Sequence, residues 1–425
     1  AADSIDISNV PKVIFAGNIN SKRLSIADVD VVHCRSQMVF SVKVSMKDVA
    51  SAVISAEIKS PAILVSDVGT MELSSQGRLV TDGLGTSTNG IGTSQTGYSQ
   101  GGGGGGHGGK GGLAARGGSE YGSVTAPSSA GSRGGSGKGP TASYTWSGGS
   151  WRSKWWCGAT PTSPSGAGGG IIRIKVDGSL NMVSGSVISS GGSAGSVTSS
   201  ACGTGGGGGG SAGSVWVTAN ALTGSGTIRA NGGNGGAADV VGGGGAGGRI
   251  ALYYTTESSA SVQRQAYGGT GDPGPAGTVF TMSNATGESS LVLDNVNRNS
   301  ACDTGLNGLQ RFAATTIVLR RAAMLVLTPS FDCFVTTITI MDSHSGITCP
   351  GVLSIHANES FTLSSSAVVR AANRLSILSN STIAISASAA VNSPTVEMNA
   401  AKSITMEQTP NVLQSVQHAA MSAPT

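Results

Sequence analysis

GIIRIKVDGSLNMVSGSVISSGG, at residues 170–192, is followed by a close relative of itself, GSVWVTANALTGSGTIRANGG, at residues 213–233. Each string opens with alternating β-branched residues, passes through one leucine, and closes on a short apolar pair before Gly-Gly. Alternation with a period of two is typical of β-strands. Because a polyglycine tract separates the strings, the chain repeats one set of strands around glycine-rich connections.

Both halves of this unit occur elsewhere in the chain. The closing phrase is present as GRLVTDG at 77–83, GSVISSG at 185–191 and GTIRANG at 226–232. The opening phrase is present again as GRIALY at 248–253 and GTVFTM at 277–282. The unit therefore spans about 62–294 in four or five versions, with strands of constant form and connections of variable length.

The C-terminal part keeps a period without the glycine. Apolar pairs at i and i+2 recur every 21 to 23 residues: Ile317/Leu319, Ile338/Ile340, Phe361/Leu363, Ile383/Ile385 and Ile404/Met406. A second series keeps the same period: Leu353/Ile355, Leu375/Ile377 and Val396/Met398. Two strand series with one period predict several short strands per coil. The predicted fold is all-β, a parallel β-solenoid with Gly-rich insertions between coils.

These patterns predict four regions. Residues 1–60 carry weaker alternation and form N-terminal coils. Residues 61–295 form the Gly-rich solenoid repeats, with a long Gly/Ser/Trp insertion at about 86–168. Residues 296–410 form regular coils of about 22 residues, and 411–425 form a C-terminal tail.

Three glycine tracts lie at 101–112, 203–213 and 232–248. They could be flexible loops, but they recur at the same place in each unit, which favours a close-packed extension in which only glycine lets backbones touch. A phosphate-binding loop is excluded because Gly111 stands where Ser or Thr must bind magnesium. A calcium-binding β-roll needs an aspartate in each repeat, and Asp239 is nearly alone. No cofactor is expected.

Charge and hydropathy exclude two classes of partner. Charged residues make up 11% of the chain, the net charge is +4, and lysine and arginine are scattered along the sequence. We therefore expect no nucleic-acid binding. No apolar run approaches the ~18 residues of a membrane span. The chain opens on Ala1, which we interpret as a processed chain or a piece of a larger protein.

Cysteines and sequons favour an extracellular or cell-surface setting. The six cysteines are even in number and lack CxxC spacing, so zinc and thioredoxin-like chemistry are not expected. Sequons at Asn284, Asn358 and Asn380 predict covalent N-linked glycans. Among the fifteen possible disulfide connectivities, the first prediction pairs Cys157 with Cys202, which bracket the first quoted string, and the second pairs Cys333 with Cys349.

An enzyme of the polysaccharide-cleaving type would need carboxylates or bases converging from neighbouring coils. At a spacing of about 22 residues no acidic residue stacks on another acidic or basic one, so we interpret Asp28, Asp30, Asp67 and Glu72 as solvated surface groups. The five histidines are isolated from one another, so no metal site is expected. The sequence predicts a non-enzymatic protein.

Four of the five tryptophans fall in SYTWSGGSWRSKWWCG at 143–158. The candidate contact residues in this segment are Tyr144, Trp146, Trp151, Arg152, Trp155 and Trp156. Three interpretations stay open: a local mini-core that pins the long loop to the solenoid, a contact between subunits, or a platform for glycans.

The order of phrases, with the closure GGGGAGGRIALYY (242–254), resembles a recurrent glycine-rich module of very large extracellular surface proteins of aquatic protists and bacteria. The resemblance covers roughly 60–295. It implies a right-handed parallel β-helix of the pectin-lyase-like kind, an extracellular setting, and roles in mastigonemes or cell coats. It implies no catalytic residue.

The functional hypothesis is a structural, non-enzymatic subunit of an extracellular filament, appendage or cell-surface coat. A stack of coils has open strand edges at its ends, and heterologous contacts that do not close generate filaments. The expected partners are further copies of the chain and other filament or coat proteins. The alternatives are a carbohydrate-binding or adhesin module of a larger surface protein and a polysaccharide-degrading β-helix enzyme.

Overall fold

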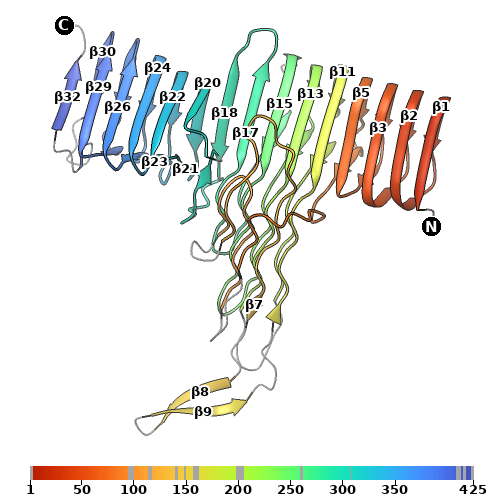
Figure 1. Cartoon of the computed structure of the whole chain (residues 1–425), viewed down its shortest axis with the longest axis horizontal. Coiled ribbons are helices and arrows are strands. Elements are labelled where there is room, and N and C mark those ends of the chain that lie inside the picture. Colours follow the sequence, from red (N-terminus) through yellow and green to blue (C-terminus); the bar gives the residue numbers. More distant parts are fainter. Residues whose placement is uncertain are drawn as a thin grey trace.

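The protein is all-β, and its strands run mostly parallel in large sheets (Figure 1). This computed structural model describes residues 3–93, 100–112, 117–138, 142–147, 150–156, 162–197, 205–258, 262–306, 308–407, 413–414 and 418–422. No helix occurs in these ranges. Most strands belong to one 22-stranded sheet, and a six-stranded sheet runs beside its C-terminal part. The prediction of an all-β, parallel fold is confirmed at this level.

The N-terminal strands are long and bent. The ladder runs β1 (Ser4–Phe15), β2 (Ile19–Cys34), β3 (Met38–Ile54), β5 (Ala62–Leu73), with every neighbouring pair parallel. Each strand has one residue with φ between 51° and 57°, at Asn9, Asp28, Asp48 and Asp67. Asparagine and aspartate tolerate this left-handed conformation better than other side chains. They let each strand change direction without leaving the ladder.

The repeated phrases pair as the sequence predicts, with one correction. The opening phrases form β11 (Ile171–Met182), β13 (Ser214–Gly224), β15 (Arg249–Glu257) and β17 (Thr278–Ser283), in parallel register. The closing phrases form β6 (Arg78–Val80), β12 (Val187–Ser189) and β14 (Thr227–Arg229). Ile188 pairs with both Leu79 and Ile228, so the phrase at 185–191 is displaced by one residue from its glycine-based alignment.

The C-terminal pairs stack as their period predicts. β17 and β18 (Ser289–Asp294) are antiparallel, and parallel pairing resumes from β18 onward. Ile317, Ile338, Phe361, Ile383 and Ile404 occupy one column of neighbouring strands. Leu353, Leu375 and Val396 form the second column. These strands are β20 (Arg311–Arg320), β22 (Ser330–Ile340), β24 (Val352–Leu363), β26 (Arg374–Ser379), β27 (Thr382–Ile385), β29 (Thr395–Ala400), β30 (Ser403–Met406) and β32 (His418–Ser422).

Shorter strands complete the sheets. They are β4 (Glu57–Lys59) and β16 (Gln263–Gln265) in the large sheet, and β19 (Thr304–Gly305), β21 (Met324–Val326), β23 (Gly346–Cys349), β25 (Val368–Ala371), β28 (Ala390–Asn392) and β31 (Leu413–Gln414) in the six-stranded sheet. The inward residues form a thin core of Val, Ile, Leu, Met and Ala, nearly all fully buried. Such a core explains why 4% aromatic residues suffice.

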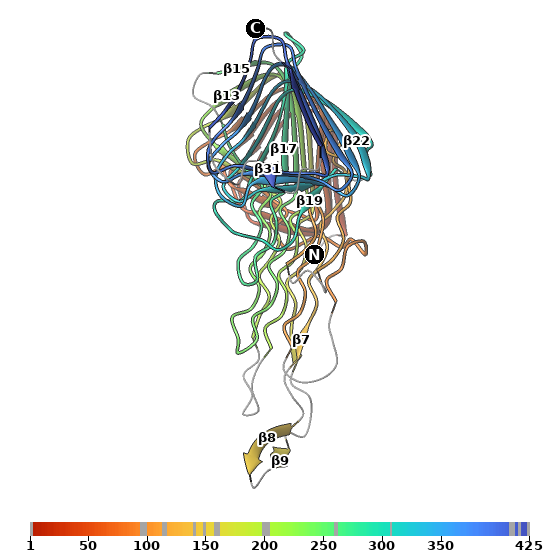
Figure 2. The same ribbon diagram turned by 90° about the vertical axis from the view of Figure 1, so that its left-hand side faces the viewer.

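A glycine-rich projection extends from one side of the stack (Figures 1 and 2). It contains the described parts of 83–138, 162–170, 190–213, 230–248 and 266–277, which run alongside one another with almost no assigned strands. Farther from the sheet lie the pair β7 (Gly137–Lys138) and β10 (Thr162–Ser163) and, farther still, the antiparallel hairpin of β8 (Ala142–Ser147) and β9 (Ser150–Trp156). The insertion therefore leads away from the sheets.

Candidate functional site

The polyglycine tracts form an ordered hydrogen-bonded lattice. The Gly102 N–H donates to the Gly206 carbonyl at 2.9 Å, the Gly209 N–H to the Gly243 carbonyl at 2.9 Å, and the Gly243 N–H back to the Gly102 carbonyl at 2.8 Å. Three tracts far apart in sequence thus satisfy one another's backbone groups. Among the described residues of these tracts, the close-packed interpretation is confirmed.

Close approach of the backbones explains the choice of glycine. A Cβ atom placed on Gly209 would lie 2.0 Å from the Gly233 carbonyl oxygen, and one on Gly245 would lie 2.0 Å from that of Gly210. Backbone atoms at such distances cannot move aside without breaking the lattice. By contrast, a Cβ on Gly17, outside the projection, would meet nothing within 4 Å. The lattice therefore requires glycine for steric reasons.

Arg249 joins the projection to the sheet. It opens β15 within the phrase GGRIALYY, and its side chain is fully buried. Its Nε donates to the Tyr121 carbonyl at 2.9 Å, and its two terminal nitrogens donate to Gly305 O at 3.1 Å and Thr278 Oγ1 at 3.4 Å. Burial lowers the pKa of the guanidinium to about 10, so it stays charged at neutral pH. One cation thus ties three separate segments together.

His107 lies beside this cation in the first glycine tract. Its ring is fully buried, 4.7 Å from the ring of Tyr121 between centroids. Within the described chain neither ring nitrogen has a partner in hydrogen-bonding geometry. Burial and the nearby Arg249 charge lower the pKa of His107 to about 3, although the Ala212 and Gly213 carbonyls act in the opposite direction. His107 is therefore neutral at physiological pH.

Segment 117–132 covers the outer face of β13, β15 and β17 at this junction. The Tyr253 hydroxyl donates to Thr125 O at 2.7 Å, the Tyr121 hydroxyl to Ala130 O at 2.6 Å, and Ser214 Oγ to Ser129 O at 2.6 Å. Beneath the segment, Trp216, Tyr253, Phe280 and Phe312 form a chain of ring contacts with centroids 5.9 to 6.4 Å apart. These residues attach the projection to the sheet.

The Trp-rich segment lies within the insertion, and its three interpretations, a local mini-core, a contact between subunits or a platform for glycans, stay predictions. Its residues 142–147 and 150–156 form the β8–β9 hairpin at the end of the projection remote from the sheet (Figures 1 and 2). Tyr121, Arg249 and Tyr253 attach the near end of the projection to the sheet. Sequence reasoning missed Arg249. Its place in the repeat was a signal, because it begins a strand phrase, and Ser214 and Thr278 hold the same position in the neighbouring copies.

The second disulfide prediction is wrong. Cys333 and Cys349 are both free thiols, as are Cys34 and Cys302, and all four are buried. Cys333 lies between Phe312 and Ile355 in the large sheet, whereas Cys349 pairs with Ala371 in the six-stranded sheet. Burial raises the pKa of Cys34 and Cys333 to about 12, which suppresses thiolate chemistry. Cys157 and Cys202 lie outside the described residues.

The three sequon asparagines are exposed. Asn284 lies between β17 and β18, Asn358 at an irregularity within β24, and Asn380 between β26 and β27. Asn380 lies beside the part of β24 that contains Asn358, because the Asn380 N–H donates to Ala357 O at 3.0 Å. Their exposed side chains are compatible with N-linked glycosylation. The modification itself stays a prediction.

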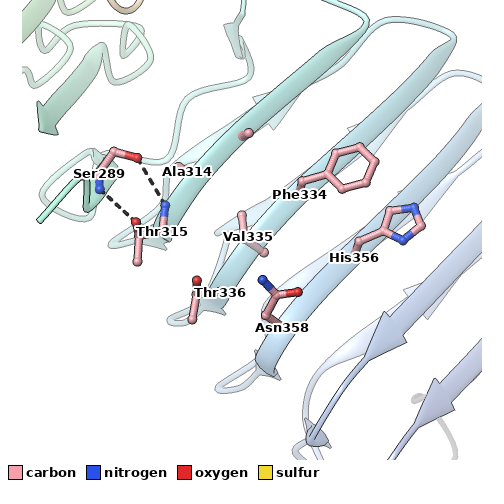
Figure 3. A pocket seen from close by; sticks show the side chains of 10 residues that line it. Ser289, Ala314, Thr315, Phe334, Val335, Thr336, His356 and Asn358 are labelled. Carbon is pink, nitrogen blue, oxygen red and sulfur yellow. Dashed lines mark hydrogen bonds between the residues drawn. The ribbon is translucent and has the colours of Figure 1, made fainter.

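A shallow groove of about 310 Å³ crosses β18, β20, β22 and β24 (Figure 3). Phe334 and His356 stack face to face at 4.6 Å, and the Arg311 guanidinium covers the other face of Phe334 at 4.2 Å. Ser289 and Thr315 exchange hydrogen bonds of 2.9 and 3.2 Å at the opposite end. Because the Phe334 ring is covered on both faces, this stack reinforces the ladder and leaves no open platform for a ligand.

Carboxylates do stack on neighbouring strands, contrary to the sequence analysis. Asp28, Asp48 and Asp67 occupy one column, because the strands in this region repeat every 19 or 20 residues instead of 22. Lys47 contacts Asp48 at 3.1 Å and Lys175 contacts Asp67 at 2.5 Å. The hydrogen bond from Lys175 is the main cause that lowers the pKa of Asp67. Because each aspartate in the column has a positive φ, we interpret these residues as the positions where the strands change direction.

The part of the chain that the structure describes contains neither a metal-binding cluster nor a helix suited to span a membrane. No group of three or more His, Cys, Asp or Glu residues is arranged to hold a metal ion there. In the same part of the chain, no helix has the length and apolar character needed to cross a membrane.

Comparison with known proteins gives no relative. The chain matches no protein-family model, no curated protein and no solved structure. The resemblance of 60–295 to glycine-rich surface modules therefore stays an expectation drawn from the order of its phrases.

Proposed function

We propose that this chain is a structural, non-enzymatic element of an extracellular filament, appendage or cell-surface coat, and that its ladders are the faces of a parallel β-solenoid. Support comes from the register, in which successive strand sets place apolar residues in continuous columns. A ladder of this kind can be extended strand by strand with no change in its geometry.

The observation that carries the proposal is the open apolar edge at β1. Among the described residues, β1 pairs with β2 on one side only. Its inward Ile5, Ile7 and Val10 are half-buried against the core. One strand further in, Leu24 and Ile26 are 1% exposed. A further parallel strand, from another molecule or from more of the same polypeptide, would cover these side chains and their free backbone groups.

Other features fit an extracellular assembly. The exposed sequons at Asn284, Asn358 and Asn380 offer solvent-facing positions for covalent glycans. The resemblance to mastigoneme and cell-coat modules points to the same setting. The proposed partners are further copies of the chain and other filament or coat proteins.

Negative-stain electron microscopy of native, undenatured material tests the assembly. We expect filaments or ordered sheets whose axial repeat is constant from one particle to the next. Dispersed single rods, at concentrations where sedimentation velocity also finds only monomers, would contradict assembly through the ends of this stack.

A further inference from the structure

The inward apolar residues of the outer strand β1 have the same spacing in both chain directions. They are separated by two, three, three and two positions: Ile5, Ile7, Val10, Val13 and Phe15. The two wider steps lie on either side of Val10, next to Asn9, whose φ of 57° marks the bend of the strand. The buried residues of β2 beneath them keep this spacing: Leu24, Ile26, Val29, Val32 and Cys34. The inward pattern of the N-terminal coil is therefore symmetric about its bend.

These inward residues of β1 form a layer that is covered from one side. Ile5, Ile7 and Val10 are half-buried, whereas their partners in β2 are at most 2% exposed. In the described chain the strand that pairs with β1 is β2, and the other edge of β1 faces away from the stack (Figure 1). This layer lacks the second apolar neighbour that each inner strand has.

A second copy of the chain can complete the layer in the antiparallel direction. Two copies joined through the same end are related by a two-fold axis, and an axis that keeps the inward faces inward reverses the strand. With the axis through Val10, this residue faces Val10 of the second copy. Ile7 then faces Val13, and Ile5 faces Phe15. Every inward residue of one copy thus meets an inward residue of the other.

The C-terminal coils match β1 less well. The buried residues of β24 are separated by two, two, four and two positions: Leu353, Ile355, Ala357, Phe361 and Leu363. In either direction this spacing displaces the central inward residue by one position from Val10, and a shift of one residue turns a side chain to the other face. Coil lengths differ as well, because Ile7 pairs with Ile26, 19 positions on, whereas Phe361 pairs with Ile383, 22 positions on. A head-to-tail contact with coils of this kind leaves Val10 uncovered.

Charge on the outward face of β1 supports the antiparallel register. Asp6 and Lys12 are the charged residues of this strand, and both are exposed. In the antiparallel register Lys12 lies opposite Ser8 of the second copy and diagonal to its Asp6. Diagonal positions are ~7–8 Å apart, within reach of a long side chain. The two-fold axis makes this attraction occur twice.

We propose that β1 is the contact surface for a second copy of this chain, bound antiparallel about a two-fold axis at Val10, so that one apolar core continues through both molecules. The inference rests on the proposed assembly and names the partner of the β1 edge. A two-fold contact closes on itself and gives a paired rod with both C-terminal ends outward. Longer filaments then require a second contact, through those ends or along the sides. Backbone pairing falls to 4–8 and 12–15, because the proline at position 11 has no N–H group.

Cysteine cross-linking of the full chain tests the register. Val10→Cys places two thiols at the axis, where Cα atoms ~4.5–5.5 Å apart suit a disulfide. Ile14→Cys is the matched control, because Ile14 lies opposite Asp6 and the two introduced thiols are then on different sides of the bend. Electrophoresis without reductant, after mild oxidation, measures covalent dimers. The parent chain sets the background from its own six cysteines, and circular dichroism verifies the β-fold of each variant.

Charge reversal gives a second measurement that needs no thiol. Lys12→Asp should weaken the dimer by roughly threefold or more in sedimentation velocity, because like charges then meet twice across the axis. Adding Asp6→Lys to this variant should restore the parent affinity. Arg370→Asp reverses a charge at an exposed site of β25 and is the matched control.

We expect covalent dimers above background from Val10→Cys but not from Ile14→Cys, and recovery of affinity in the double charge variant. Assemblies in electron micrographs without Val10→Cys cross-links would overturn this contact and leave the proposed assembly standing. Equal cross-linking of both cysteine variants would also overturn it. Monomers alone in sedimentation velocity would contradict the contact and the assembly together. Cross-linked dimers that form no larger species would support the contact and contradict a filament.

Discussion

Single residues hold the projection in place, and Arg249 is the most consequential of them. Its guanidinium has no carboxylate in direct contact among the described residues, yet its donors satisfy two buried carbonyls and a threonine hydroxyl. A buried cation is tolerated when such acceptors surround it. Its removal would leave acceptors on three segments without a partner.

Arg249→Met should therefore loosen the junction. Each acceptor left without a donor costs about 1 to 3 kcal/mol, so we expect faster tryptic cleavage at Arg133 and Lys138, while the C-terminal ladder stays resistant. Arg370→Met, which alters an exposed arginine of the six-stranded sheet, is the matched control. Unchanged cleavage in Arg249→Met would mean that the aromatic contacts alone hold the projection.

His107 should make the fold sensitive to acid. Its pKa is about 3 in the folded chain and 6.5 for an ordinary histidine. Between these values the unfolded state binds a proton that the folded state does not. The free energy of unfolding should thus fall, by up to about 1.4 kcal/mol per pH unit, as the pH decreases below 6.5, and should be insensitive to this group at higher pH.

Urea unfolding followed by tryptophan fluorescence at pH 7, 5 and 4 measures this dependence. His107→Phe should reduce the loss of stability on acidification, because the variant has no imidazole to protonate. His344→Asn, at an exposed position with φ of 62°, should retain the loss seen in the parent chain. If His107→Phe and the parent chain lose stability equally, the acid response comes from other groups.

At the scale of elements, strands were more predictable from the sequence than the projection. The columns headed by Ile317 and Leu353 followed from a fixed period of apolar pairs, because inward residues of stacked strands must match. The carboxylate column at Asp28, Asp48 and Asp67 was missed because its shorter repeat differs from the C-terminal one. A fixed period in the sequence indicates a column only where successive strand sets are equal in length.

The junction could not be predicted in the same way. Arg249 contacts residues 56 and 128 positions away in the sequence, and no periodic pattern relates those segments. Similarly, the glycines of the phrase at 185–191 indicate a register that differs by one residue from the real one, because the ladder is set by the apolar Ile188. Packing of the inward side chains takes precedence over the position of turns.

The polyglycine lattice should be intolerant of a single methyl group. Gly245→Ala would place Cβ 2.0 Å from Gly210 O, so the tracts must separate and lose hydrogen bonds on both sides. We expect destabilisation of at least about 2 kcal/mol, consistent with overpacking of a tight interior. Gly17→Ala, which has open space at Cβ, should be neutral or slightly stabilising. Thermal unfolding of both variants makes the comparison, and equal melting temperatures would contradict a close-packed lattice.

At the scale of the whole molecule, assembly should depend on the inward face of β1. Ile7 is half-buried and belongs to the column continued by Ile26 and Met46, so a further strand would bury it fully. Ile7→Lys would place a charge in that new interface, and a buried unpaired charge is strongly unfavourable. We expect Ile7→Lys to remain folded, because β1 is an outer strand, but to lose filaments in electron micrographs and large species in sedimentation velocity. Ile14→Lys, at a position already 44% exposed, is the control and should assemble normally.

Pro11 lacks an N–H group, so the pairing of a further strand is interrupted there and the segments on either side must carry the contact. Filaments of undiminished length from Ile7→Lys would exclude the β1 edge as the growing end and direct attention to lateral contacts between stacks.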